Sequence, residues 1–220
     1  MAIMKTRDRI LAASLELFNT RGERHVTTNH IANHLGMSPG NLYYHFRNKP
    51  MIVAELFQRF EQRLDAFFTL PEAPLTLDHK ADLLEQLLQI IWQFRFLQQD
   101  LDQLLEADPD FAQRYHAFAQ RSLRHARGLY QAFIDAGILL MDARQLEALT
   151  LNAWIIINSW ARLPGAQPRG QQLTEQFLRR GIYQLLMLED GYIAPAHRPA
   201  IGALHARLQV PLGELLPGLD

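Results

Sequence analysis

Apolar residues recur three and four positions apart along most of this 220-residue chain, and strict two-residue alternation is hard to find. This spacing is the period of α-helices that each bury one face, so it predicts an all-α fold. The chain is 48% hydrophobic, which is enough to form a sizeable core. Its length allows two compact units as well as one elongated domain.

Helix boundaries follow from residues that start or stop helices. Gly22 and Gly36 are expected stops, and Ser38 is an expected amino-terminal cap. A proline-containing loop over residues 70–77 and a linker over residues 164–170 separate longer helices. The expected helices cover about residues 6–21, 27–36, 38–46, 50–68, 78–97, 97–107, 110–136, 143–163, 171–188 and 198–208. The buried faces of the first four should contain Ile10, Leu11, Ser14, Leu17, Phe18, Ile31, Ala32, Leu35, Leu42, Phe46, Val53, Leu56, Phe57, Phe60, Leu64 and Phe67.

Basic residues are concentrated near the amino terminus. Residues 1–60 hold eight basic and four acidic side chains, a net charge of +4, whereas the remaining residues carry a net charge of −5. Such asymmetry indicates that the amino-terminal part meets a polyanion and that the rest does different work. We expect a cytoplasmic protein without membrane contact, because no apolar stretch is long enough for a signal sequence or a membrane span.

Several kinds of chemistry are excluded or disfavoured by the residues present. The chain has no cysteine, which excludes disulfides, thiolate nucleophiles and sulfur-ligated metal sites. His30 and His34 have the four-residue spacing of a helical metal site, but no third ligand is evident nearby, so we expect a solvated or DNA-facing pair. The known hydrolase, phosphate-loop, zinc-protease and dinucleotide motifs are missing. We therefore predict no metal, no cofactor and no enzymatic activity.

Two short expected helices flank the tight turn Gly36-Met37-Ser38, as in a helix-turn-helix whose second helix enters the major groove of DNA. The side chains around this turn are unusually rich in groups that donate to phosphates or reach base edges. They are Thr27, Thr28, Asn29, His30, Ser38, Asn41, Tyr43, His45, Arg47 and Lys49. A purely structural helical hairpin rarely needs this density of donors, although Arg47 read alone fits a solvated surface charge.

The segment from Thr27 to Lys49, TTNHIANHLGMSPGNLYYHFRNK, resembles the DNA-binding signature of the TetR family of bacterial one-component transcriptional regulators. The similarity spans about residues 6–60, and beyond it only helical pattern and length agree. Pro50 departs from the family, which usually has an acidic or polar residue at this position. Proline is harmless in the first turn of a helix, so it puts only the start of the expected helix 50–68 in doubt.

The resemblance implies a role for each matching position. Thr28 should hold a phosphate, although a helix cap alone is an equal alternative, and Asn29 occupies a position that can touch a base. Tyr43, His45 and Lys49 should reach phosphates, while Tyr44 is expected to pack inward beside the buried Leu42 and Phe46, with an exposed position as the alternative. The predicted DNA-binding residues are Thr28, Asn29, Ser38, Pro39, Gly40, Asn41, Tyr43, His45 and Lys49, with Pro39, Gly40 and Asn41 facing base edges and Ser38 capping its helix in any case.

The resemblance also implies that the rest of the chain dimerises and binds a small effector. Aromatic residues beside isolated polar groups are the effector candidates, although ordinary core packing is the stronger alternative for each one. They are Trp92, Phe96, Tyr115, Phe118, Arg121, His125, Asn152, Trp154, Ile156 and Asn158. The homodimer should form through the last two long helices, which carry Leu146, Leu149, Ala153, Ile157 and Trp160 and then Phe177, Gly181, Ile182, Leu185 and Leu188.

The expected organisation is a helix-turn-helix domain over residues 1–50 and an effector-binding and dimerisation domain over residues 51–190, joined by the helix 50–68. Residues 191–220 have no assigned role. The expected function is a regulator, most simply a repressor, that leaves a palindromic double-stranded operator when a small molecule binds. The alternatives are an activator of the same fold, and a helical enzyme or carrier that keeps the hairpin only as scaffold.

Overall fold

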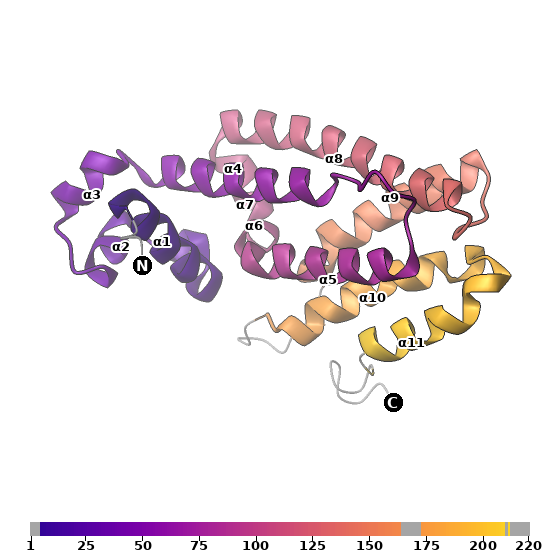
Figure 1. Ribbon diagram of the computed structural model, residues 1–220. Helices are drawn as coiled ribbons and strands as arrows, with labels where there is room; N and C mark the ends of the chain where they lie inside the picture. Colours follow the sequence, from indigo (N-terminus) through magenta and orange to yellow (C-terminus); the bar gives the residue numbers. More distant parts are fainter. Residues whose placement is uncertain (1–4, 164–172, 210, 212–220) are drawn as a thin grey trace. The chain divides into compact units, whose positions relative to one another are not determined.

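The computed structural model describes residues 5–163, 173–209 and 211, and within these residues the chain is helical, as predicted (Figure 1). The only pairing of extended backbone among them is an isolated bridge between Leu139 and Ile193. The α-helices are α1 (Thr6–Arg21), α2 (Thr28–His34), α3 (Pro39–His45), α4 (Lys49–Phe67), α5 (Leu77–Gln93), α6 (Arg95–Gln99), α7 (Leu101–Ala107), α8 (Pro109–Asp135), α9 (Ala143–Ser159), α10 (Glu175–Glu189) and α11 (Arg198–Leu208). Short 3₁₀ segments are η1 (Glu23–His25), η2 (Trp160–Arg162), η3 (Asp190–Tyr192) and η4 (Pro195–His197).

One expected helix is divided. The sequence pattern predicted a continuous helix over residues 78–97, but α5 ends at Gln93 and α6 starts at Arg95. Phe94 has φ −112° and ψ 29°, outside the helical region, and the Asn19 side-chain oxygen accepts the Phe96 N–H at 3.1 Å. A side chain far away in the sequence therefore satisfies a backbone donor at the break, which the local apolar period could not show. The predicted linker over residues 164–170 lies outside the described residues.

The chain divides into two compact units. Unit 1 comprises Met1–Arg63 and Phe94–Ala117, and unit 2 comprises Leu64–Gln93 and Phe118–Asp220. Helices α4 and α8 each contribute residues to both units without a break in the helix.

Unit 1 contains the first three helices, part of α4, α6, α7 and the start of α8. Nearly all the predicted inner positions of α1 to α4 are buried, with Leu35 at an intermediate exposure. Phe18 of α1 packs against Phe96 of α6 with ring centroids 5.3 Å apart, and Phe57 of α4 packs against Phe111 of α8 at 5.0 Å. Burial of these aromatic rings, together with the aliphatic side chains around them, stabilises unit 1.

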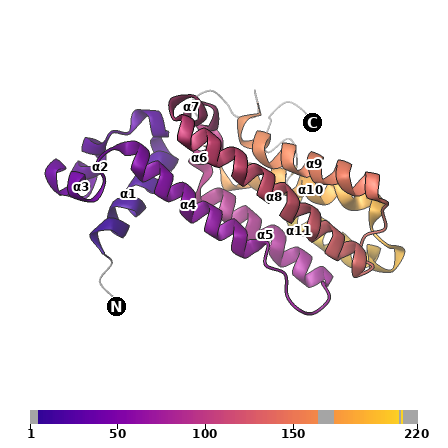
Figure 2. The same cartoon turned by 90° about the horizontal axis from the view of Figure 1, so that it is seen from above.

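In unit 2, α10 packs against α5, α9 and α11, and Figure 2 shows α9 and α10 side by side. Gly181 allows the close approach of α10 and η2, because a Cβ there would lie 2.6 Å from the Trp160 indole. The Trp160 N–H also donates to the Phe177 carbonyl at 2.7 Å. Beyond residue 191, α11 is part of this unit, since Ile201, Leu204 and Leu208 are buried.

A buried polar cluster joins three helices of unit 2. Lys80 of α5 and Glu189 of α10 form an ion pair, although each side chain is almost completely shielded from solvent. The Lys80 ammonium also lies 4.3 Å from the centre of the Phe133 ring of α8. Burial, together with the neighbouring Glu189 carboxylate, raises the pKa of Tyr130 well above its ordinary value, so this phenol remains neutral.

No helix in the described parts of the chain is both long and apolar enough to cross a membrane.

Candidate nucleic-acid interface

The predicted helix-turn-helix is formed by α2, a tight turn and α3. The Thr27 hydroxyl caps α2 by accepting the His30 N–H at 3.2 Å, while the His30 ring accepts the Thr27 N–H. Gly36 ends this helix at φ +64°, a conformation that favours glycine, and the Met37 N–H returns to the Ala32 carbonyl at 3.0 Å. Ser38 caps α3 through the Asn41 N–H at 3.2 Å, with Pro39 in the first turn. The turn therefore fixes both helices as predicted.

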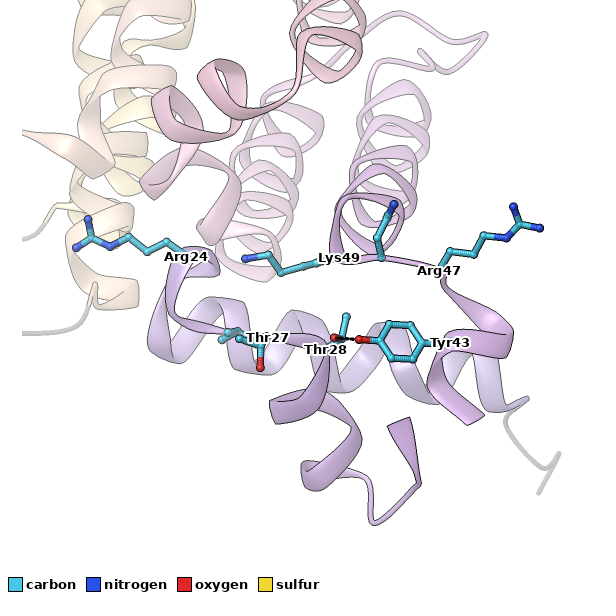
Figure 3. Close-up of a pocket in the computed structure, with 8 residues that line it drawn as sticks. Arg24, Thr27, Thr28, Tyr43, Arg47 and Lys49 are labelled. Atoms are coloured by element: carbon cyan, nitrogen blue, oxygen red, sulfur yellow. Dashed lines mark hydrogen bonds between the residues drawn. The ribbon is translucent and has the colours of Figure 1, made fainter. Parts of the chain in front are cut away.

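A hollow of about 300 Å³ opens between the amino-terminal end of α2 and the carboxyl-terminal end of α3, the two helix ends that lie away from the turn (Figure 3). Three of the eight described residues that line it are basic, and none is acidic. Hydroxyl groups of α2 and α3 lie next to these charges, so the hollow offers the donors that a phosphate oxygen needs. The lining residues are Arg24, Val26, Thr27, Thr28, Tyr43, Arg47, Asn48 and Lys49, and we call this the phosphate hollow.

The structure brings together three of the predicted phosphate ligands, Thr28, Tyr43 and Lys49, in the phosphate hollow. The Thr28 and Tyr43 hydroxyls, which point toward each other in Figure 3, are 3.1 Å apart and share a hydrogen bond. Sequence reasoning did not place Arg24 in the site, and it gave Arg47 a surface role as an alternative. For Arg24 the only sequence signal was the basic excess of residues 1–60, whereas Arg47 was also one of the donors expected around the turn.

Lys49 has a partner inside the protein. Its ammonium lies 2.8 Å from the carboxylate of Glu23 and 3.0 Å from the Glu23 carbonyl oxygen, and Glu23 is 5% exposed. The Gln103 amide of α7 donates to the same carboxylate at 3.3 Å, and the Glu23 N–H donates to Asp100 at 2.7 Å. These four residues, Glu23, Lys49, Asp100 and Gln103, are the Glu23 junction, which ties the start of α4 to η1, α6 and α7 within unit 1.

The remaining predicted DNA contacts lie on exposed surface. Asn29 of α2 is exposed, and so are Pro39, Gly40 and Asn41 at the start of α3. His45 is half-buried and is not among the described residues that line the phosphate hollow. Its carbonyl oxygen accepts a hydrogen bond from Arg7 at 3.1 Å.

The expectation that Tyr44 packs inward is wrong, because this side chain is 85% exposed. Leu42 and Phe46 already occupy the inner face of α3 and are completely buried. A helix turns by about 100° per residue, so a side chain between two inward positions points outward. Large aromatic size was a poorer guide here than helical spacing.

The two histidines with metal-ligand spacing have other neighbours. His30 belongs to the cap of α2, and the His34 ring lies 3.7 Å from the Glu16 carboxylate. Within the described residues, no group of three or more histidine, cysteine, aspartate or glutamate side chains is placed to hold a metal ion.

The predicted effector residues are divided between the units. Phe96 and Tyr115 belong to unit 1, where Phe96 packs against Phe18 and the Tyr115 ring lies 6.0 Å from that of Phe57. The others belong to unit 2, and there the structure brings Phe118 and Trp154 together, with ring centroids 6.5 Å apart. Among the others, Arg121 pairs with Asp65, the His125 ring packs against that of Phe68, and the Asn158 amide donates to the Trp154 carbonyl. Asn152 is exposed, and Trp92 and Ile156 have intermediate exposure.

Comparisons with known proteins agree with this geometry. A family model described as bacterial regulatory proteins, tetR family, matches residues 10–56, and one described as bacterial transcriptional repressor matches residues 59–201. A TetR-family transcriptional regulator from Marinobacter aquaeolei VT8 is 41% identical over 94% of this chain and 100% of that chain, with a TM-score of 0.84. The chain belongs to the TetR family.

Two less similar solved structures share the fold with this TetR-family chain. A regulatory protein in the tetR family from Rhodococcus RHA1 is 20% identical, covers 87% of this chain and 100% of its own, and has a TM-score of 0.61. The ketosteroid transcriptional regulator KstR2 of Mycobacterium tuberculosis is also 20% identical, with coverages of 88% and 97% and a TM-score of 0.62.

Family membership establishes the class of function: this TetR-family protein is a DNA-binding transcriptional regulator. Regulators of the family are in general DNA-binding proteins without enzymatic activity, and they bind small molecules and dimerise. Repression and release from DNA by an effector are typical of them.

The Glu23 junction predicts a measurable coupling. We expect Lys49→Ala to lower the free energy of unfolding by about 1–3 kcal/mol, because the buried Glu23 carboxylate loses its counter-ion. In a Glu23→Gln background the same substitution should cost less, since no buried charge is left without a partner. Urea unfolding of the four proteins measures this difference, with the exposed Lys5→Ala as the control. Equal losses in both backgrounds would show that Lys49 does not serve Glu23.

Proposed function

We propose that this protein is a homodimeric repressor that holds a palindromic operator through the phosphate hollow and the exposed face of α3, and that a small molecule bound in unit 2 releases it. The observation that carries the proposal is the phosphate hollow, in which basic and hydroxyl side chains of η1, α2, α3 and the start of α4 meet. In domain terms, residues 1–50 read DNA, the helix 50–68 connects, and residues 51–190 bind the effector and the partner subunit.

The charges of the hollow support a phosphate as its occupant. Glu23 neutralises Lys49, so the positive field at the mouth rests on Arg24 and Arg47, both of which are exposed. An arginine can donate two parallel hydrogen bonds to a phosphate, and the hydroxyls of Thr28 and Tyr43 add neutral donors. Contacts of this kind position the protein on the duplex and carry no sequence information, whereas Asn29, Pro39, Gly40 and Asn41 are free to face base edges.

An exposed stripe on α9 supports the proposed dimer. Leu151 and Ile155 are 46% and 58% exposed and lie one helical turn apart, while Leu146, Leu149 and Ala153 of the same helix are buried. Met187 of the neighbouring helix α10 is also 44% exposed. A second copy of the chain would cover these apolar side chains, and a two-fold dimer would present two α3 helices to successive major-groove faces about 34 Å apart.

The proposed effector site lies beside Phe118 and Trp154 of unit 2. These two rings supply apolar surface from α8 and α9, and Arg121, one turn along from Phe118, offers a cation that now faces Asp65 at 3.3 Å. A small amphipathic molecule with an acidic group would match this combination. The molecule can release the operator only if it binds the DNA-free conformation more tightly than the DNA-bound one.

The phosphate role of Arg47 is tested by salt dependence. We expect Arg47→Ala to weaken binding to the operator and to an unrelated duplex by a similar factor, and to reduce the slope of log K against log salt by about 0.9 per lost phosphate contact. Gel shift on the DNA upstream of the protein's own coding sequence, repeated over a salt series, measures both quantities. The control is Arg127→Ala, an exposed arginine of unit 2. A wild-type slope in Arg47→Ala would contradict the proposal.

The dimer is tested by placing a charge in the stripe. Ile155→Glu should raise the dissociation constant of the dimer by roughly tenfold or more, because a carboxylate would be buried without a partner in each subunit. Sedimentation velocity over a concentration series measures the change. Leu140→Glu alters a side chain of similar exposure, 57%, that lies outside α9 and α10, and it should leave the dimer intact. Dissociation of both variants to the same degree would argue against the α9 stripe.

The effector site is tested with a thermal-shift screen of small aromatic carboxylic acids. A compound that binds the folded protein should raise the melting temperature and lower operator affinity. Trp154→Ala should reduce the melting shift at a fixed compound concentration. A compound whose shift survives this substitution binds elsewhere, and the Phe118–Trp154 site would then be rejected for it.

A further inference from the structure

Tyr43 and Tyr44 are adjacent in α3 but have different surroundings. Tyr43 shares a hydrogen bond with Thr28 and lines the phosphate hollow. Tyr44 is 85% exposed, the highest exposure among the large hydrophobic side chains of the described residues, and its ring meets that of His45 edge-on at 5.2 Å. Nothing in the described part of the chain covers the Tyr44 ring, so it is open to a contact from outside.

The face of α3 that carries Tyr44 also carries Gly40 and Asn41, which lie four and three residues earlier on the same side of the helix. A Cβ added at Gly40 would meet no atom of the described structure within 4 Å beyond its own helix and chain neighbours. The helix backbone is therefore bare at Gly40, with a flat aromatic ring one turn further along. We call Gly40 and Tyr44 the notch.

We propose that the notch reads the C5-methyl group of a thymine in the major groove. The proposal rests on the DNA-binding function and names the base that one part of the surface selects. Thymine presents a methyl group in the major groove, and apolar side chains recognise it by contact. The bare backbone at Gly40 leaves room for a methyl group, and the Tyr44 ring supplies apolar surface beside that room. Asn41, the polar member of the face, can pair with a neighbouring base edge.

The chemistry of the notch distinguishes this assignment from a further phosphate contact. A phosphate needs cations and several donors, and these are gathered in the phosphate hollow, on the side of α3 that carries Tyr43 and next to Arg47, which follows the helix. The notch offers no side chain at Gly40 and only one hydroxyl, at the end of the Tyr44 ring. Removal of that hydroxyl separates the two possibilities, because a methyl contact uses the ring and a phosphate contact uses the oxygen.

The test compares thymine with deoxyuridine, which lacks only the methyl group. A duplex is first selected from a random library by the wild-type protein, and each thymine of one half-site is then replaced in turn. We expect one position at which deoxyuridine weakens binding by about fourfold, the effect of losing one buried methyl-sized group. Tyr44→Phe should retain this sensitivity, whereas Tyr44→Ala should lose it. Both variants should keep the wild-type melting temperature, because the ring is exposed.

A size swap at Gly40 provides an independent test of the same contact. Gly40→Ala adds a methyl group from the protein side and should weaken binding to the selected duplex. With deoxyuridine at the sensitive position, the added protein methyl replaces the missing thymine methyl, so this variant should bind the modified duplex better than the unmodified one. The wild-type protein should show the opposite order.

The outcomes that overturn the proposal are specific. If deoxyuridine has no effect at any thymine, if its effect persists in Tyr44→Ala, or if Tyr44→Phe loses as much affinity as Tyr44→Ala, the notch does not read a methyl group. If the wild-type protein selects no duplex at all, the DNA-binding function itself fails, and this result is distinct from a selected duplex that ignores the methyl group.

Discussion

A carboxylate that is removed from water must be matched by partners, and Glu23 meets this requirement at the point where the DNA-binding helices join the rest of unit 1. Lys49 and Gln103 donate to its side chain, and its backbone N–H donates to Asp100. The start of α4 is consequently held next to η1, and Thr28, Tyr43 and Arg47 border the same hollow as Lys49. Glu23 thus holds one of the residues that line the hollow, Lys49, from inside unit 1.

Much of the helix-turn-helix could be predicted from the sequence because its signals are local. Ser38 and Thr27 cap the helices that follow them, and Gly36 takes the positive φ that ends α2. The same helical period places Tyr44 outward, between the inward positions Leu42 and Phe46. The prediction for Tyr44 was wrong because the size of its ring was given more weight than this period. The break at Phe94 depends on Asn19, which is 77 positions away from the Phe96 N–H that it accepts, so no local pattern contains it.

The candidate site was harder to predict where it depends on pairing between distant residues. Lys49 was expected to face phosphate, and its ion pair with Glu23, 26 residues earlier, could not be seen from spacing. Arg24 enters the hollow only because η1 follows Gly22, whose φ of +80° turns the chain at the end of α1. The effector candidates show the same limit, because helical spacing gave no means of assigning Phe96 and Trp154 to different units.

The discontinuity of unit 1 has a consequence for how such regulators can be recombined. A fragment that ends at Arg63 would carry every residue of the phosphate hollow, yet it would lack Phe94–Ala117. Glu23 would then lose Asp100 and Gln103, and Glu61 would lose Arg114, which donates to it at 2.9 Å. A chimera that grafts these first residues onto a foreign sensor would therefore have to bring α6, α7 and the first third of α8 with them, so the transferable module is larger than its DNA-contacting surface.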